Sequence, residues 1–349
     1  MRVVVASTYV PFIKGGGTKI VEDLQREFVS RGYETETVMF PFDSHWRQVP
    51  EQTTALRLFD LTESAGRRND LLVTIRYPSY ALQHPNKVAW FIHHHREAYD
   101  LWGTEWCGMP DNEEGRHYRA MMHQSDNLYL GECRKIFTNS QVVADRLRRF
   151  NNIEPQAVLY PPLATDHPFR PGPFGDYIVY PSRLSRIKRQ HLAIEAMQSV
   201  RPPLRLVIIG KGDSPKYEKK LRREIQRLGL QDRVQMLGWV SESEKARWIA
   251  ESCGTLYLAY DEDSYGYVTL EAFHSHKPVI TLSDSGGPNE VIRDRHNGLV
   301  VPPQPEPLAE AMNRLWQDRP WAAELGRAAN ATLNKFCINW DHVIGSMVA

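Results

Sequence analysis

The sequence has little cysteine and no long apolar run. Its 349 residues include only four cysteines, Cys107, Cys133, Cys253 and Cys337, which lie far apart and form no C-x-x-C pair. We therefore expect no disulfide framework and no zinc site, but reduced thiols in a cytoplasmic protein. No stretch approaches the ~18 apolar residues that a membrane span needs. The first apolar stretch, at residues 3–6, is too short for a signal peptide and predicts a strand instead.

The sequence also lacks an excess of charge of either sign. Lys and Arg number 43 and Asp and Glu number 42, which leaves a formal charge of +1. A dedicated nucleic-acid-binding protein normally carries a basic surface, so this balance argues against one. We see no polybasic amphipathic helix and therefore expect at most weak peripheral contact with the inner face of a membrane.

Short apolar runs alternate with segments of helical period along almost the whole chain. This alternation predicts βαβ units and parallel sheets. A stretch of residues 160–175 that is rich in proline and glycine separates two such series and predicts a linker. The strands expected are residues 3–7, 71–75, 88–92 and 136–139 before the linker, and 177–181, 204–209, 234–237, 255–259 and 279–282 after it.

We therefore predict an α/β protein with two Rossmann-like βαβ domains facing a cleft. The N-terminal domain is expected at residues 1–165 and the C-terminal domain at residues 166–330. Phe336, Trp340 and Val343 repeat at helical spacing after the second sheet is complete. Residues 331–349 are therefore expected to hold a helix that returns to the N-terminal domain.

Three segments follow predicted strands, where ligands bind in open α/β sheets. Gly15-Gly16-Gly17 precedes a predicted helix, and its backbone N–H groups suit an anion, although glycine runs also form plain turns. Arg183 and Lys188 open another helix and suit a diphosphate, but two charges at a helix start can equally be solvated.

The third segment contains two acids separated by seven residues, Asp263 and Glu271, with Gly266 between them. Asp263 is expected in a loop and Glu271 about one turn into a helix, so both can face one ligand. Carboxylates that accept from vicinal hydroxyls suit a sugar nucleotide. The alternative is a surface loop followed by an acid near the start of a helix.

Together these segments resemble the GT-B glycosyltransferases, specifically the retaining family GT4. The resemblance covers most of the chain and rests on the order and spacing of many short motifs. Besides the segments above, they are Phe137-Thr-Asn-Ser140, Gly210-Lys-Gly212, Leu237-Gly-Trp239, Lys277-Pro-Val-Ile280 and Gly286-Gly287-x-x-Glu290.

The resemblance implies a retaining, metal-independent transfer of a sugar from a nucleoside diphosphate sugar to an acceptor hydroxyl. The acceptor would be a saccharide, a lipid-linked saccharide or a small glycoside, with no cofactor. The residues implied in catalysis are Arg183, Lys188, His93 and Asp263. Those implied in donor binding are Gly16, Gly17, Arg183, Lys188, Asp263, Tyr265, Gly266, Tyr267, Val268 and Glu271. Those expected near the acceptor are His95, Arg96, Tyr99 and Trp102.

The roles implied for these residues differ. Arg183 and Lys188 would hold the diphosphate and stabilise the charge that develops on the leaving group. Glu271 would bind the ribose hydroxyls, and Asp263 would contact the transferred sugar. Asp263 stands where the family usually has a glutamate, so this contact can differ. His93 would lie near the reacting carbon.

Several alternatives stay open at this point. The three consecutive residues His93-His94-His95 raise the possibility of a metal site, but no acidic or cysteine partner has matching spacing. Asp261-Glu262-Asp263 spells the D-x-D metal motif of GT-A transferases. A sugar-nucleotide 2-epimerase has the same two-domain fold, and a non-catalytic sugar-binding subunit is a third function class.

Overall fold

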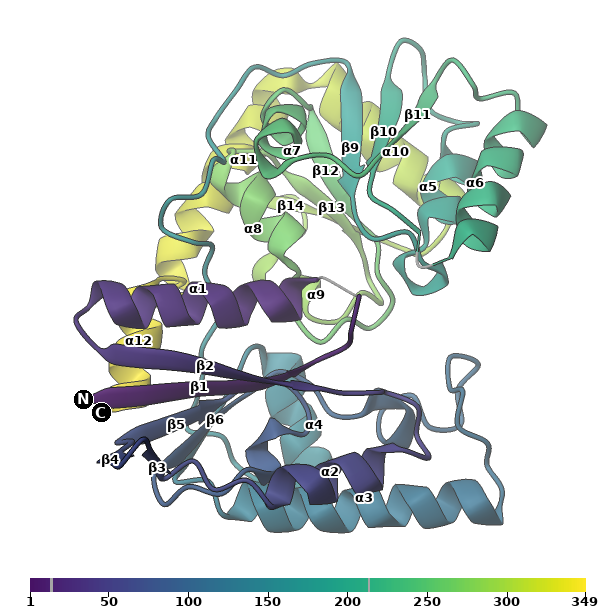
Figure 1. Cartoon of the computed structure of the whole chain (residues 1–349). Coiled ribbons are helices and arrows are strands. Elements are labelled where there is room, and N and C mark those ends of the chain that lie inside the picture. The colour runs from purple at the N-terminus through teal and green to yellow at the C-terminus, as the bar shows by residue number, and fades with distance from the viewer. Residues whose placement is uncertain (13–14, 213) are drawn as a thin grey trace. The chain divides into compact units, whose positions relative to one another are not determined.

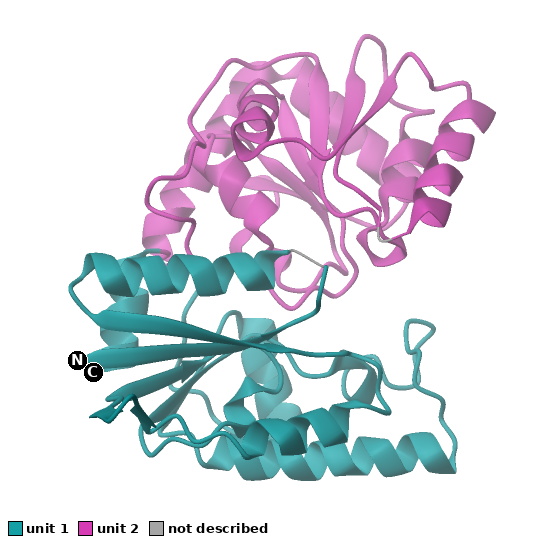
Figure 2. Cartoon of the chain, in the orientation of Figure 1, with its two compact units in different colours: residues 1–161, 339–349 teal, residues 162–338 magenta. Residues whose placement is uncertain are grey.

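A computed structural model describes residues 1–12, 15–212 and 214–349. The chain divides into two compact units, residues 1–161 with 339–349 (unit 1) and residues 162–338 (unit 2), coloured separately in Figure 2. Each unit contains a six-stranded sheet in which the paired strands run parallel. The prediction of two Rossmann-like units is therefore confirmed.

Unit 1 has the strand order β2-β1-β5-β6-β7-β8. Its sheet strands are β1 (Arg2–Tyr9), β2 (Glu34–Pro41), β5 (Leu71–Thr74), β6 (Lys87–Phe91), β7 (Lys135–Thr138) and β8 (Ala157–Val158), and β3 (Glu63–Ser64) and β4 (Arg67–Arg68) form a small hairpin. Its helices are α1 (Gly16–Ser30), α2 (Val49–Arg57), α3 (Glu113–Gly131), α4 (Gln141–Asn151) and α12 (Trp340–Val348).

Unit 2 has the strand order β11-β10-β9-β12-β13-β14. Its strands are β9 (Tyr177–Pro181), β10 (Arg205–Ile209), β11 (Val234–Gly238), β12 (Gly254–Tyr257), β13 (Val279–Leu282) and β14 (Gly298–Val301). Its helices are α5 (Gln190–Ala196), α6 (Pro215–Arg227), α7 (Glu242–Ala250), α8 (Tyr267–His274), α9 (Pro288–Val291), α10 (Pro305–Gln317) and α11 (Arg319–Lys335), as Figure 1 shows.

Burial on both faces explains which strands the sequence predicts well. Every residue of β5, β6, β9, β12 and β13 is buried, as expected for parallel strands that have helices on both sides. These strands are continuous runs of mainly apolar residues, and the bounds predicted for β9 and β13 are those of the structure. The predicted linker, residues 160–175, contains no helix or strand.

Several elements of the fold were not predicted, among them the edge strands β2, β8 and β14, the hairpin of β3 and β4, and helix α3. The edge strand β2 consists largely of half-buried and exposed residues, because it has a strand neighbour on one side only. Its sequence, Glu-Thr-Glu-Thr-Val-Met-Phe-Pro, therefore lacks the apolar run of an interior strand. The long helix α3 has few buried residues and a weak apolar stripe, which hides it from a search for helical periodicity.

Helix α6 corrects one of our expectations. It carries six basic residues and two acidic ones in thirteen positions, while Leu221 and Ile225 are buried. It is therefore a polybasic amphipathic helix, which we had judged absent from the sequence. In the part of the chain that the structure describes, no helix is both long enough and apolar enough to cross a bilayer.

The C-terminal helix α12 returns to unit 1 and contacts α1 (Figure 1). Residues 331–338, expected to return with it, belong to unit 2 instead. Helix α12 begins only at Trp340, because the side chain of Asn339 accepts a hydrogen bond from the N–H of His342 and caps the helix. Trp340 is buried in the core of unit 1, with its ring centroid 6.3 Å from that of Trp90. Apolar burial therefore holds the last residues of the chain on the first sheet.

Replacing Trp340 with alanine should destabilise unit 1 by about 3–5 kcal/mol, the usual cost of removing a buried large aromatic ring. Chemical denaturation followed by far-ultraviolet circular dichroism measures this loss. The matched control is His342→Ala on the same helix, since His342 is exposed and should change stability by no more than about 0.5 kcal/mol. Equal effects of the two variants would show that the Trp340 contact does not hold the helix.

Candidate functional site

The site in unit 2 forms where β9 and β12 end. The loop after β9 carries Arg183, which is exposed, and continues through a short 3₁₀ turn at Arg186–Lys188. The backbone carbonyl of Lys188 accepts a hydrogen bond from the buried Tyr180 hydroxyl. These contacts fix Lys188 at the end of the central strand of the sheet.

Arg189, which sequence analysis did not select, anchors the same loop. Its backbone is left-handed, with φ at 56°. Its guanidinium donates to the carbonyls of Leu258 and Ala259 at 2.7 and 3.0 Å and to the carboxylate of Asp284 at 2.8 Å. The loop that carries Lys188 is therefore tied to the loop that follows β12.

Lys188 meets two side chains that come from β12 and the segment after it. Its Nζ forms an ion pair with Glu262 and lies 3.3 Å from the hydroxyl of Tyr257. The Tyr257 hydroxyl in turn donates to Glu262 Oε2 at 3.1 Å. Lys188, Glu262 and Tyr257 therefore form one polar cluster, and Glu262 is a member that sequence analysis did not select.

Arg183 and Asp263 lie close enough to this cluster to act on it electrostatically. Burial raises the pKa of Tyr257, the charge of Asp263 raises it further, and the charge of Arg183 lowers it. Gly266 belongs to the same arrangement, since its φ is +69° and a Cβ there would lie 2.4 Å from Tyr257 Cζ. Four predicted site residues therefore lie around Tyr257, namely Arg183, Lys188, Asp263 and Gly266.

Glu271 lies on α8 and is almost fully buried. Its Oε1 accepts from Lys245 Nζ at 2.7 Å, and Lys245 also pairs with Glu242 at 2.9 Å. Burial alone lowers the pKa of Lys245, but the charges of Glu271 and Glu242 outweigh this effect and raise it. Lys245 was not predicted, because its helix, α7, precedes β12 and only the fold brings the two side chains together.

The remaining predicted donor residues lie where α8 begins. Tyr265 is buried, and its carbonyl accepts from the Thr269 hydroxyl at 2.6 Å. Tyr267 and Val268 are half-buried in the first turn of α8. The side chain of Tyr265 is therefore part of the protein interior.

In unit 1, the predicted glycine loop leads into α1. Gly17 lies against Arg76, because a Cβ at Gly17 would lie 3.1 Å from the Cδ and Nε of Arg76. Burial lowers the pKa of Arg76. Among the residues that the structure describes, no carboxylate pairs with Arg76, and the first turn of α1 holds no acid. The glycine loop thus lies beside a cation that sequence analysis missed.

The three histidines follow β6 and are not part of a strand, since β6 ends at Phe91. His93 is half-buried and donates from Nδ1 to the carbonyl of His94 at 2.8 Å, because a carbonyl can only accept. His94 and His95 are both buried. Because they follow the strand, the three histidines do not alternate between the two faces of the sheet.

The loop expected to face the acceptor is partly buried. His95 Nε2 lies 2.9 Å from the carbonyl oxygen of Ser44. The hydroxyl of Tyr99 donates to Asp126 Oδ2 at 2.6 Å, and the Tyr99 ring is 3% exposed. Arg96 pairs with Asp100 at 2.7 Å, and Trp102 is half-buried beneath the guanidinium of Arg119.

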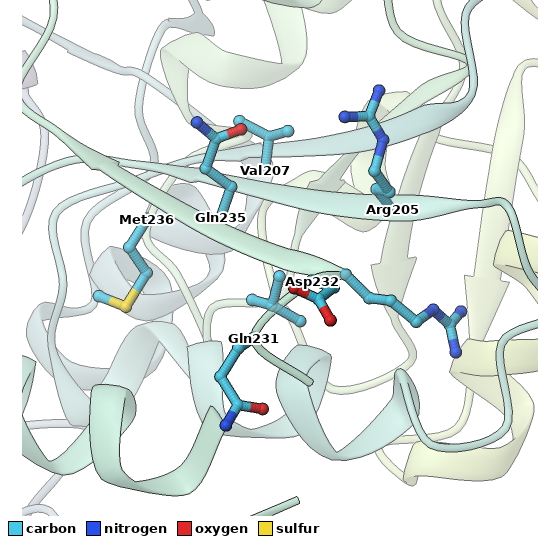
Figure 3. A pocket seen from close by; sticks show the side chains of 8 residues that line it. Arg205, Val207, Gln231, Asp232, Gln235 and Met236 are labelled. Carbon is cyan, nitrogen blue, oxygen red and sulfur yellow. The ribbon is translucent and has the colours of Figure 1, made fainter. Parts of the chain in front are cut away.

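A separate hollow lies along the outer strand β11 of unit 2 (Figure 3). It is lined by Arg205, Val207 and residues 231–236, and none of the predicted site residues lines it. Among residues 1–12, 15–212 and 214–349, we find no group of three or more His, Cys, Asp or Glu side chains placed to hold a metal ion.

Comparison with known proteins identifies the family to which the chain belongs. The sequence pattern described as glycosyl transferases group 1 matches residues 153–332, which cover almost all of unit 2. An exopolysaccharide phosphotransferase of Streptomyces coelicolor is 34% identical over 199 residues, 54% of this chain and 21% of that protein. The chain spans less than half the length of the first three curated relatives.

Solved structures share the fold along nearly the whole chain. Sucrose-phosphate synthase from Thermosynechococcus elongatus has a TM-score of 0.77 at 18% identity, with 99% of this chain and 97% of that chain covered. Anabaena HepE, solved in complex with UDP-glucose, has a TM-score of 0.73 at 17% identity, with 99% of each chain covered. These likenesses confirm the predicted GT-B fold.

The buried carboxyl group of Asp126 makes the stability of unit 1 depend on pH. Burial raises the pKa of Asp126 to about 7, although the hydroxyls of Tyr80 and Tyr99 donate to it and oppose the shift. Because the folded-state pKa exceeds the unfolded value near 4, stability from this group is present at acidic pH and is lost as pH rises from about 4 to about 7. Asparagine in place of Asp126 cannot ionise, so this substitution should remove the loss of stability at rising pH.

Unfolding free energies of wild type and Asp126→Asn, compared between pH 4 and pH 8, test the effect. The difference should shift in favour of the variant by a few kcal/mol over this range, following the linkage between pKa and stability. Asp111→Asn is the control, because Asp111 is exposed and should show no comparable shift. A pH-independent difference for Asp126→Asn would refute the prediction.

Proposed function

The chain belongs to the group 1 glycosyl transferases, the GT4 family, and we propose that it transfers a sugar from a nucleoside diphosphate sugar to an acceptor hydroxyl with retention of configuration. The observation that carries this proposal is the polar cluster at the end of β9 and β12. There Lys188 meets Glu262 and Tyr257, with Arg183 and Asp263 in electrostatic range. The UDP-glucose bound to HepE supports the same class of donor.

The two cations would act on the leaving group. As the bond between the sugar and the diphosphate breaks, negative charge grows on the departing phosphate. Lys188 and Arg183 would stabilise that charge electrostatically. Asp263 would face the sugar, which becomes electron-poor as the bond breaks, and His93 would lie near the reacting carbon.

The other residues would bind parts of the donor that do not react. Glu271 would accept from the ribose hydroxyls while Lys245 pairs with its carboxylate and orients it. Backbone groups at Gly266, Tyr267 and Val268 would contact the sugar. N–H groups of Gly16 and Gly17 would approach the diphosphate beside Arg76.

The acceptor would bind through unit 1, and the loop of His95, Arg96, Tyr99 and Trp102 remains the proposed contact. We propose unit 1 as the acceptor-binding domain and unit 2 as the donor-binding domain, with residues 339–349 returning to the first. We further propose that the reaction needs no metal ion, because Arg183 and Lys188 can neutralise the diphosphate.

Incubation with UDP-, GDP-, ADP-, CDP- and TDP-sugars in EDTA tests this function. Slow release of one nucleoside diphosphate, accelerated by a hydroxyl acceptor, is the expected result. Epimerised donor would support a 2-epimerase instead. Binding without turnover would support a non-catalytic subunit, and turnover only with added Mn²⁺ or Mg²⁺ would support the D-x-D metal interpretation.

The roles of the cations and of Glu271 predict different kinetics. Lys188→Ala and Arg183→Ala should lower kcat by about 10²–10³-fold, because their partner gains charge only as the bond breaks. Glu271→Gln should mainly raise the donor KM, since the ribose hydroxyls carry the same charge in the ground and transition states. Asp263→Ala should show an intermediate pattern.

Steady-state kinetics of these four variants with one donor measure whether each substitution changes kcat, the donor KM or both. Glu244→Gln is a suitable control, because Glu244 is on α7 like Lys245 but has no role in the proposed site. A loss of kcat at unchanged KM for Glu271→Gln, together with a change of KM alone for Lys188→Ala, would reverse the assigned roles.

Peripheral contact with a membrane is supported by helix α6. Lys216, Lys219, Lys220, Arg223 and Arg227 recur at helical spacing, and all are exposed. Arg227 pairs with Glu224. No carboxylate among the described residues pairs with the other four. A stripe of exposed cations attracts an anionic bilayer by about 1 kcal/mol for each charge near the surface.

Flotation with vesicles of neutral lipid, and with vesicles containing anionic lipid, tests this contact. We expect binding to the anionic vesicles only, with loss at high salt because the attraction is screened. Replacing Lys216, Lys219, Lys220 and Arg223 with glutamine should abolish it. Replacing Lys135, Arg149 and Arg205, which lie outside α6, with glutamine should leave vesicle binding unchanged. If the α6 variant still binds the anionic vesicles like wild type, α6 is not the membrane contact.

A further inference from the structure

The motif Gly286-Gly287 has no role in the function described so far, and the structure shows what it does locally. Gly286 has a φ of +73°, and a Cβ there would lie 2.7 Å from the carbonyl oxygen and 2.8 Å from the nitrogen of Glu262. A Cβ at Gly287 would lie 2.4 Å from the carbonyl carbon of Ser264. Neither position has room for a side chain.

Backbone hydrogen bonds use this close approach to fix Glu262. The N–H of Glu262 donates to the carbonyl of Ser285 at 2.8 Å, and the N–H of Gly287 donates to the carbonyl of Glu262 at 2.9 Å. The backbone of Glu262 is therefore bonded on both sides to the loop after β13. The two glycines set the point from which the Glu262 side chain extends.

From that point the Glu262 carboxylate reaches the two other members of the polar cluster. It pairs with Lys188 and accepts from the Tyr257 hydroxyl. The side chains of Lys188 and Glu262 are 14% and 23% exposed, so the pair is shielded from much of the solvent. The Tyr257 ring occupies the space that a side chain at Gly266 would fill.

We propose that Glu262 is a positioning residue that serves as the counter-ion of Lys188 while the diphosphate site is empty, and that it gives up Lys188 to the donor phosphate. This inference rests on the proposed function and extends it. The donor diphosphate and Glu262 are both anions that compete for one ammonium group. Glu262 therefore orients Lys188 before the donor arrives and weakens the binding of every diphosphate there.

This competition favours the transition state. Lys188 leaves Glu262 most readily when the phosphate carries the most charge, which happens as the sugar–phosphate bond breaks. Part of the favourable interaction between Lys188 and the phosphate is therefore absent while the intact donor is bound. It forms only as the leaving group develops its charge. After transfer, Glu262 recaptures Lys188 and helps to release the nucleoside diphosphate.

The test is the effect of Glu262→Gln on diphosphate binding. Glutamine keeps the size of the side chain and an oxygen for Tyr257 but removes the charge that competes for Lys188. The nucleoside diphosphate that best raises the melting temperature among UDP, GDP, ADP, CDP and TDP is the probe for titration calorimetry, with inorganic pyrophosphate as a second probe. We expect Kd to fall by about two- to fivefold, in line with the usual energy of a partly exposed ion pair.

The direction of the change separates this role from a merely structural one, because a distorted site would bind more weakly. In steady-state kinetics, the donor KM and kcat of Glu262→Gln should both fall, since product leaves more slowly. In a Lys188→Ala background, Glu262→Gln should no longer change Kd. The exposed Glu310 of α10 supplies the control Glu310→Gln, which should bind like wild type.

The outcomes separate a failure of the proposed function from a failure of the counter-ion role. If none of the five nucleoside diphosphates binds the wild-type protein, the proposed function fails. If one binds but Glu262→Gln leaves Kd unchanged or raises it, the counter-ion role is wrong while the proposed function stands. A gain in affinity that persists without Lys188 would also overturn the counter-ion role.

Discussion

The ion pair between Lys188 and Glu262 is the contact on which the arrangement of the polar cluster, the proposed donor site, depends. It joins the loop after β9 to the segment after β12, two neighbouring strands of one parallel sheet. An isolated ammonium group in a partly buried place is costly, so Lys188 needs a negative partner at all times. The protein supplies Glu262 as that partner, and the proposed reaction supplies a phosphate in its place.

The rest of unit 2 holds these two side chains in position. Arg189 ties the Lys188 loop to carbonyls after β12 and to Asp284 after β13. Gly286 and Gly287 bring the loop after β13 against Glu262. Three successive strand ends therefore converge on one cluster, as expected where parallel strands present their carboxyl ends at the same edge.

The sequence predicted the sheets well because interior parallel strands are buried on both faces and appear as apolar runs. Motif spacing placed Arg183, Lys188, Asp263 and Glu271 after strands, and the structure has them in the segments after β9 and β12. It missed Glu262, although Glu262 is adjacent to Asp263, because spacing does not tell which of two neighbouring side chains turns toward Lys188. Lys245 and Arg189 were missed because each meets its partner only through the folded sheet.

Helix α6 and Asp126 illustrate two further limits. The near-zero charge of the whole chain hid the basic stripe of α6, since charge was summed over residues that the fold separates. Asp126 shows no sequence signal, because its neighbours Tyr80 and Tyr99 come from other segments of unit 1. Both features depend on tertiary structure and not on local pattern.

The crystal structure of the protein with its nucleoside diphosphate would test the central claim most directly. The account predicts an oxygen of the distal phosphate within hydrogen-bond distance of Lys188 Nζ, with the Glu262 carboxylate no longer in contact with that ammonium group. A diphosphate bound elsewhere, with Lys188 still paired to Glu262, would contradict it.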